Sequence, residues 1–119
     1  TAGDWHWRLA GAESVADFSA PDGTVQLRLT CTAAGRVELL LPGTVRSNAV
    51  LNLRSESVER AVAGTARVGG LAAALDATDP LLDAMALSRG RFAVEAAGFA
   101  PLYLPSWPEV SRVIEDCRD

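Results

Sequence analysis

The sequence predicts a mainly β fold, an antiparallel β-sandwich or flattened barrel of about seven or eight strands with two short helices. Apolar and polar residues alternate at period two in several short runs, which indicates strands with one buried face. Gly- and Pro-containing turn signals separate these runs. Residues 80–89 and 107–117 instead carry helix-start signals followed by apolar residues at helical spacing. The 119 residues fit one β-rich domain, 1–119, and 49% hydrophobic residues can supply its core.

The clearest strands lie in the first half of the chain. Residues 25–31 alternate strictly, which places Cys31 on the buried face. A turn containing Gly35 and a second alternating run, residues 37–41, predict a β-hairpin. Residues 49–54 form a third alternating run.

Other strand candidates are weaker, and they cover residues 5–9, 15–18, 58–63 and 66–75. Gly64 and the Gly69-Gly70 pair interrupt the last two, which suggests turns or bulges. Residues 71–75 contain three consecutive alanines and are compatible with either a strand or a helix.

The segment 80–89 has helix signals at both ends. Asp79 suits the N-cap, Pro80 the first helical position, and Gly90 the position just after the helix. Two further alternating runs follow, residues 92–96 and 102–104.

The last helix, residues 107–117, follows a capping-box pattern with Ser106 at the N-cap and Glu109 three residues later. Its apolar residues share one helical face: Val110, Val113, Ile114 and Cys117.

The two cysteines, Cys31 and Cys117, both lie on predicted apolar faces. We expect a disulfide that staples the last helix onto the sheet, since a zinc site needs closely spaced Cys or His ligands and the chain has one His. Such a bridge implies a periplasmic or extracellular location. The chain begins at Thr1 without Met, so we expect that a signal peptide has been removed.

The net charge of −4 and the eleven dispersed arginines argue against a nucleic-acid surface, which needs a basic patch. No apolar run approaches the roughly 18 residues of a membrane span. We therefore expect a protein partner, with no nucleic acid and no membrane span, and leave the oligomeric state open.

No catalytic constellation is recognisable. The single His6 lies on a predicted strand and is expected on the surface. The carboxylates near the first helix, at Asp76, Asp79 and Asp83, have an adequate capping role, and no calcium-loop pattern is present. We expect no catalytic residues, no metal and no cofactor, and thus no enzyme.

Trp5 and Trp7 share one face of the first predicted strand. Their indoles could form a stacking platform for a sugar, or they could fill one end of the core. We expect Trp107 to pack at the start of the last helix.

Arg89 and Arg91 flank Gly90 at an exposed helix-to-strand junction. They could anchor an acidic group of a partner. They could equally form internal ion pairs with Asp83, Glu95 or Asp116.

The layout of residues 25–117 resembles small periplasmic β-sandwich proteins of alphaproteobacteria, of the invasion-associated locus B type. The resemblance rests on the inward Cys31, the stretch from Asp79 to Phe92, the late hairpin through Leu104, and the ending from Trp107 to Arg118. It implies a compartment and a fold, and supplies no catalytic residues.

The sequence thus predicts a non-enzymatic periplasmic or secreted binding or accessory protein that acts through a protein–protein surface. One alternative is a module that binds carbohydrate or envelope glycan through Trp5 and Trp7. Another is an inhibitor of a secreted enzyme such as a lysozyme, with an inhibitory loop at residues 42–48 or 54–60.

Overall fold

The computed structural model describes residues 1–119, and it confirms the mainly β class. It contains nine strands, slightly more than the seven or eight expected, because both weak N-terminal candidates and both halves of the 58–75 region form strands. In chain order the elements are β1 (Asp4–Ala10), β2 (Glu13–Ser19), β3 (Val25–Cys31), β4 (Arg36–Pro42), β5 (Ala49–Arg54), β6 (Glu59–Arg67), β7 (Gly70–Asp76), α1 (Pro80–Ala86), β8 (Arg91–Ala96), β9 (Leu102–Pro105) and α2 (Pro108–Arg118).

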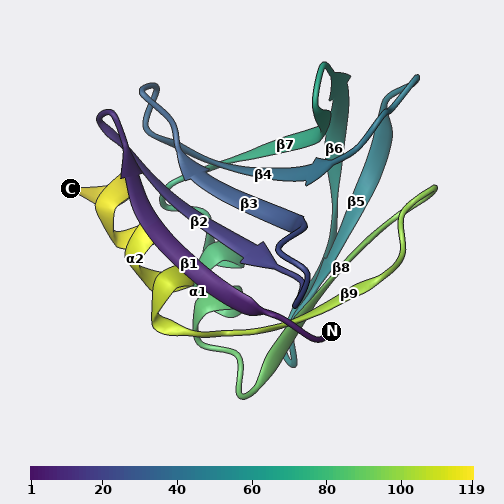
Figure 1. The fold of residues 1–119 in the computed structure, drawn as a ribbon. Helices are drawn as coiled ribbons and strands as arrows, with labels where there is room; N and C mark the ends of the chain where they lie inside the picture. The colour runs from purple at the N-terminus through teal and green to yellow at the C-terminus, as the bar shows by residue number, and fades with distance from the viewer.

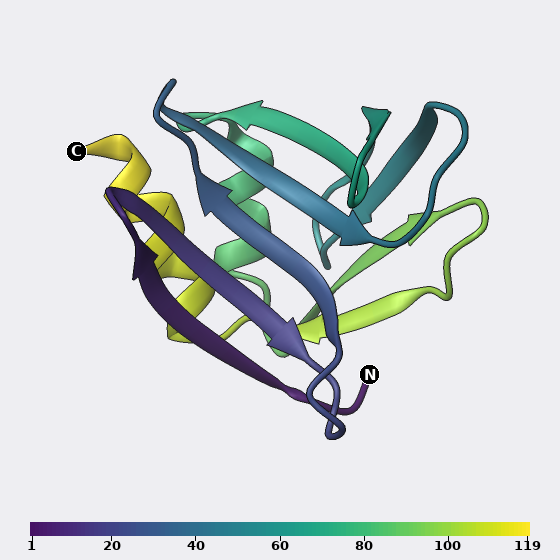
Figure 2. The ribbon, with the colours of Figure 1, turned by 45° about the horizontal axis from the view of Figure 1, so that its top comes forward.

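The strands form one antiparallel sheet in the order β1-β2-β3-β4-β7-β6-β5-β8-β9. The sheet curls into a half-barrel, so that its two edge strands, β1 and β9, approach each other (Figure 1). Both helices lie on the inner side of the curl, behind β1–β4 in the view of Figure 2. The architecture is thus closer to the flattened barrel than to a sandwich of two separate sheets.

Gly64 lies where β6 changes partner. It is paired with Ala49 of β5, whereas the next residue, Thr65, pairs with Ala72 of β7. A Cβ atom at Gly64 would lie 2.5 Å from the carbonyl oxygen of Ala49 and 2.5 Å from Leu51 Cδ1. The glycine therefore permits the close approach at which the sheet bends, and it lies inside a strand, not at a turn between two strands.

The hydrophobic core contains 25 buried residues from the inner face of the sheet and from both helices. The period-two alternation is confirmed in the β3–β4 hairpin, where Leu27, Leu29, Val37 and Leu39 are fully buried. The segment left open between strand and helix, residues 71–75, belongs to β7.

Helix α1 begins as predicted and ends earlier than predicted. Asp79 is its N-cap and accepts a hydrogen bond from the Leu81 N–H at 2.9 Å, with Pro80 at the first position. The helix stops at Ala86, not at residue 89. The chain leaves the helix because the Ser88 hydroxyl donates to the Arg91 carbonyl at 2.7 Å and draws residues 88–91 into a turn.

We expect the Asp79 carboxylate to make stability depend on pH. Arg60 Nη2 donates to Asp79 Oδ2 at 2.6 Å, and this bond, with that from the Leu81 N–H, lowers the pKa of Asp79 below its ordinary value of 3.8. A carboxyl with a lowered native pKa stabilises the fold above its unfolded pKa and loses that contribution as pH falls through the native pKa. When the pH is lowered from neutral to below 3.8, the melting temperature of the Asp79→Asn protein should therefore fall less than that of the unchanged protein. Identical melting-temperature profiles for the two proteins would contradict this role.

The predicted capping box at helix α2 is wrong. The N-cap is Trp107, which makes no side-chain cap hydrogen bond, and Pro108 occupies the first helical position. The Ser106 hydroxyl instead donates to the Met85 carbonyl at 2.7 Å, which satisfies a free carbonyl in the last turn of α1. Ser106 thus ties the two helices together, and Glu109 has no capping partner there.

The predicted disulfide between Cys31 and Cys117 is confirmed, with 5.3 Å between the two Cα atoms. Helix α2 also buries Val110, Val113 and Ile114 against the inner side of the sheet. The bridge joins the end of β3 to the last turn of α2, across 86 residues of sequence.

Candidate functional site

Most arginines of the chain are held by carboxylates. Eight of the eleven form an ion pair: Arg8, Arg28, Arg36, Arg54, Arg60, Arg67, Arg112 and Arg118. The other three are Arg46, in the loop after β4, and the two predicted site residues, Arg89 and Arg91.

The internal partners proposed for Arg89 and Arg91 are all occupied. Asp83 pairs with Arg118 at 2.8 Å. Glu95 pairs with Arg54 at 3.2 Å, and Asp116 pairs with Arg112 at 3.3 Å. None of the three internal ion pairs considered for Arg89 and Arg91 is therefore formed.

Hydrogen bonds hold the backbone that carries these arginines. We call residues 88–91 the arginine junction. Besides the bond from Ser88 to the Arg91 carbonyl, the Arg89 N–H donates to the Glu56 carboxylate, and the Ser106 N–H donates to the Gly90 carbonyl at 3.0 Å. Gly90 has a φ of +94°, which only glycine adopts without strain. Both arginine side chains are exposed beside this hydrogen-bonded turn.

A shallow pocket of about 370 Å³ adjoins the arginine junction. Arg54 and Tyr103 line it together with Arg89 and Arg91, and Glu56 is its one acidic residue. Tyr103 is 42% exposed, so the pocket offers an aromatic ring beside three guanidinium groups.

Trp5 and Trp7 do share the inner face of β1, but they do not form a surface platform. Trp5 is only 3% exposed, and its indole N–H donates to the Pro105 carbonyl at 2.8 Å. Trp7 is half-buried, its N–H donates to the Ser14 hydroxyl, and the Arg112 guanidinium lies 3.9 Å from its ring centroid. The two-indole sugar platform is therefore absent, and Trp5 belongs to the core.

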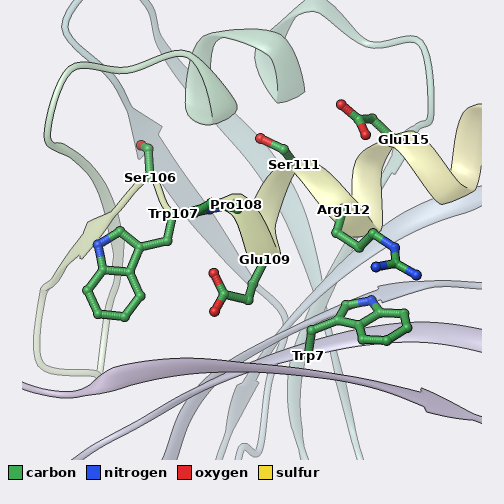
Figure 3. Close-up of a pocket in the computed structure, with 8 residues that line it drawn as sticks. All are labelled: Trp7, Ser106, Trp107, Pro108, Glu109, Ser111, Arg112 and Glu115. Carbon is green, nitrogen blue, oxygen red and sulfur yellow. The ribbon is translucent and has the colours of Figure 1, made fainter.

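A larger groove, of about 970 Å³, lies between β1 and the first two turns of α2 (Figure 3). We call it the indole groove, because Trp7 and Trp107 both line it. Trp107 is 39% exposed, and its indole N–H makes no hydrogen bond within the chain. The Glu109 carboxylate lies between the two indoles in Figure 3 and forms no ion pair.

The arginine junction and the indole groove are adjacent. Ser106 lines the groove, and its N–H is bonded to Gly90 of the junction. Trp107 follows directly in the chain. The two sites are therefore neighbours, with the unpaired Arg89 and Arg91 on one side of Ser106 and the unpaired Glu109 on the other.

Sequence reasoning missed the indole groove because it assigned Trp107 to packing and Glu109 to a capping box. Pro108 is the signal that could have revealed it. A proline favours the first helical position, which puts the N-cap at residue 107 and leaves the Glu109 carboxylate available for other contacts.

Other candidate residues play no part in this surface. His6 is exposed on β1 and forms no side-chain hydrogen bond. Asp76 pairs with Arg36 at 3.4 Å. No group of three or more His, Cys, Asp or Glu residues is placed to hold a metal ion. No helix has both the length and the apolar character needed to cross a membrane.

The two candidate inhibitory loops are short, and hydrogen bonds hold both of them. In the loop after β4, Gly43 donates its N–H to the Gly69 carbonyl, and Asn48 Oδ1 accepts from the Ala66 N–H at 2.8 Å. Val45 of the same loop packs against the core. Residues 55–58 form a tight turn closed by the Ser55 N–H and the Val58 carbonyl at 2.8 Å.

No protein-family model matches the chain, and no curated protein matches its sequence. Among solved structures, that of invasion associated protein B from Bartonella henselae is similar, with a TM-score of 0.53 over 100% of this chain and 97% of that chain. The two sequences are 15% identical, so the likeness shows a shared fold. The resemblance of layout found in the sequence is confirmed at that level.

Proposed function

We propose that this chain is a non-enzymatic, extracytoplasmic accessory protein that binds a protein partner through the arginine junction. The proposal proceeds from the fold shared with invasion associated protein B and from the chemistry of the surface. The observation that carries it is that the side chains of Arg89 and Arg91 are exposed and form no ion pair, in a chain that pairs eight of its eleven arginines.

Rigidity makes this arginine pair suitable for recognition. Three hydrogen bonds and the Gly90 turn hold the backbone, so binding orders only the two side chains. A guanidinium group binds a carboxylate with two parallel hydrogen bonds, and arginine is enriched among interface residues that dominate affinity. The partner should accordingly present acidic side chains to the arginine junction.

Two further observations support the class of protein. The Cys31–Cys117 disulfide suits an oxidising compartment, which favours a periplasmic or extracellular location. The single histidine has no serine or cysteine hydrogen-bonded to it, so the usual nucleophile–base pair is not assembled. The glycan-platform alternative gains no support, because Trp5 is buried.

The test is a pull-down from an envelope extract, in which Arg89→Ala with Arg91→Ala should abolish capture of the partner that the unchanged chain retains. Arg46→Ala is the matched control, since Arg46 is also exposed and unpaired but lies in a different loop. The free energy of unfolding should change by no more than about 0.5 kcal/mol in either variant, because no internal ion pair is lost.

Mass spectrometry of the captured proteins decides the outcome. Full capture by the Arg89/Arg91 double variant would eliminate the arginine junction as the binding site. Equal loss of capture in the Arg46→Ala protein would mean that overall charge, and no defined site, governs the interaction.

A further inference from the structure

We infer that the indole groove is the second half of the same interface, and that it binds an arginine side chain of the partner between Trp107 and Glu109. The inference rests on the proposed function for the existence of a partner. The chemistry of the groove stands on separate residues and can be tested without the partner.

The exposed indole of Trp107 and the carboxylate of Glu109 are the two groups that a guanidinium needs. The face of an indole attracts a cation, and a carboxylate accepts charge-assisted hydrogen bonds from it. Neither group has a partner of this kind within the chain: Glu109 forms no ion pair, and the single cation over an indole is Arg112, over Trp7.

The other wall of the groove contains the same arrangement already filled. The Arg112 guanidinium lies 3.9 Å from the centroid of the Trp7 ring while its Nε donates to Asp116 Oδ2 at 3.3 Å. The chain itself thus places a guanidinium over an indole and beside a carboxylate in this groove. Trp107 with Glu109 offers the equivalent pair of groups on the open side (Figure 3).

The charge of the indole groove and its position beside the arginine junction both favour a protein segment as its occupant. Glu109 and Glu115 line the groove without ion pairs, and Arg112, its one cation, is engaged by Asp116. A basic side chain complements this surface, whereas the neighbouring arginine junction complements an acidic one. A partner segment with an acidic and a basic residue would span both, and Trp107 would lie at the centre, where tryptophan most often dominates binding.

The groove can be tested with a capped Gly-Arg-Gly peptide, followed through the three tryptophan indole N–H signals by NMR. We expect the Trp107 signal to shift saturably at millimolar peptide, while the hydrogen-bonded signals of Trp5 and Trp7 move little. Glu109→Gln should weaken binding about tenfold, the effect of losing a charged hydrogen bond. Glu59→Gln, the same change at an exposed site on β6, should leave the affinity unchanged.

Three results would overturn the inference. They are an unmoved Trp107 signal, equal affinity in the Glu109→Gln protein, and a Trp107 shift produced by a neutral oligosaccharide such as cellotetraose but not by the arginine peptide. None of them depends on Arg89 or Arg91. The peptide titration thus tests the prediction for the indole groove, and the pull-down separately tests the prediction for the arginine junction.

Discussion

Replacing both cysteines, Cys31→Ala with Cys117→Ala, should lower the free energy of unfolding by about 4–5 kcal/mol. The bridge closes a loop of 86 residues, and in the chain-entropy model that loop greatly restricts the unfolded chain. The loss is large compared with the roughly 5–15 kcal/mol that stabilise most domains. Guanidinium unfolding followed by far-ultraviolet circular dichroism measures it.

Reduction of the unchanged protein provides the control for this experiment. Dithiothreitol should lower its melting temperature toward that of the double variant, and the variant itself should not respond. A melting temperature that reductant leaves unchanged, with alkylation proving that both thiols are free, would show that the packing of α2 alone holds the helix in place.

Trp5→Ala should cost about 3–5 kcal/mol, the range for truncating a large buried aromatic residue. Trp5 contacts both ends of the curled sheet. Its ring packs edge-to-face on Phe18 of β2 at 5.4 Å and stacks on Phe92 of β8 at 6.4 Å between centroids. Its indole N–H also bonds to Pro105 at the end of β9. Truncation would therefore open a cavity between two edges that share no strand ladder.

Two other variants separate the causes of this effect. Trp5→Phe keeps a ring and removes the N–H, and should cost about 1–3 kcal/mol because the Pro105 carbonyl loses its donor. Trp107→Ala, at a tryptophan that is 39% exposed against 3% for Trp5, should cost clearly less. Urea midpoints for the three proteins test the ranking, and a Trp5→Ala midpoint equal to that of Trp107→Ala would refute the role of Trp5.

The fold class could be predicted from local patterns because one face of most strands is buried. The alternation in residues 25–31 and 37–41 survives in the structure as buried leucines and the buried Val37. The alanine run 72–74 could not be assigned, since alanine favours helices and three consecutive alanines show no alternation of apolar and polar residues. It became a strand because it lies between β4 and β6 in the sheet.

Of the two surface features, the arginine junction could be predicted from the sequence and the indole groove could not. Gly90 between two arginines marks the arginine junction in the sequence itself. Whether Arg89 and Arg91 are paired depends on which carboxylates other arginines reach, and those contacts join residues as far apart as Asp83 and Arg118. The indole groove depends on the placement of α2 against β1, which no local pattern contains.

The disulfide closes residues 31–117 into a covalent ring, and the residues before Cys31 form an arm outside that ring. The ring runs from Cys31 to Cys117 and contains both helices and strands β4–β9, whereas β1 and β2 lie entirely on the arm. Trp7 on the arm and Trp107 in the ring form opposite walls of the indole groove. The width of the groove is therefore set by the non-covalent contacts that hold the β1–β2 hairpin in the sheet, because the disulfide does not connect its two walls.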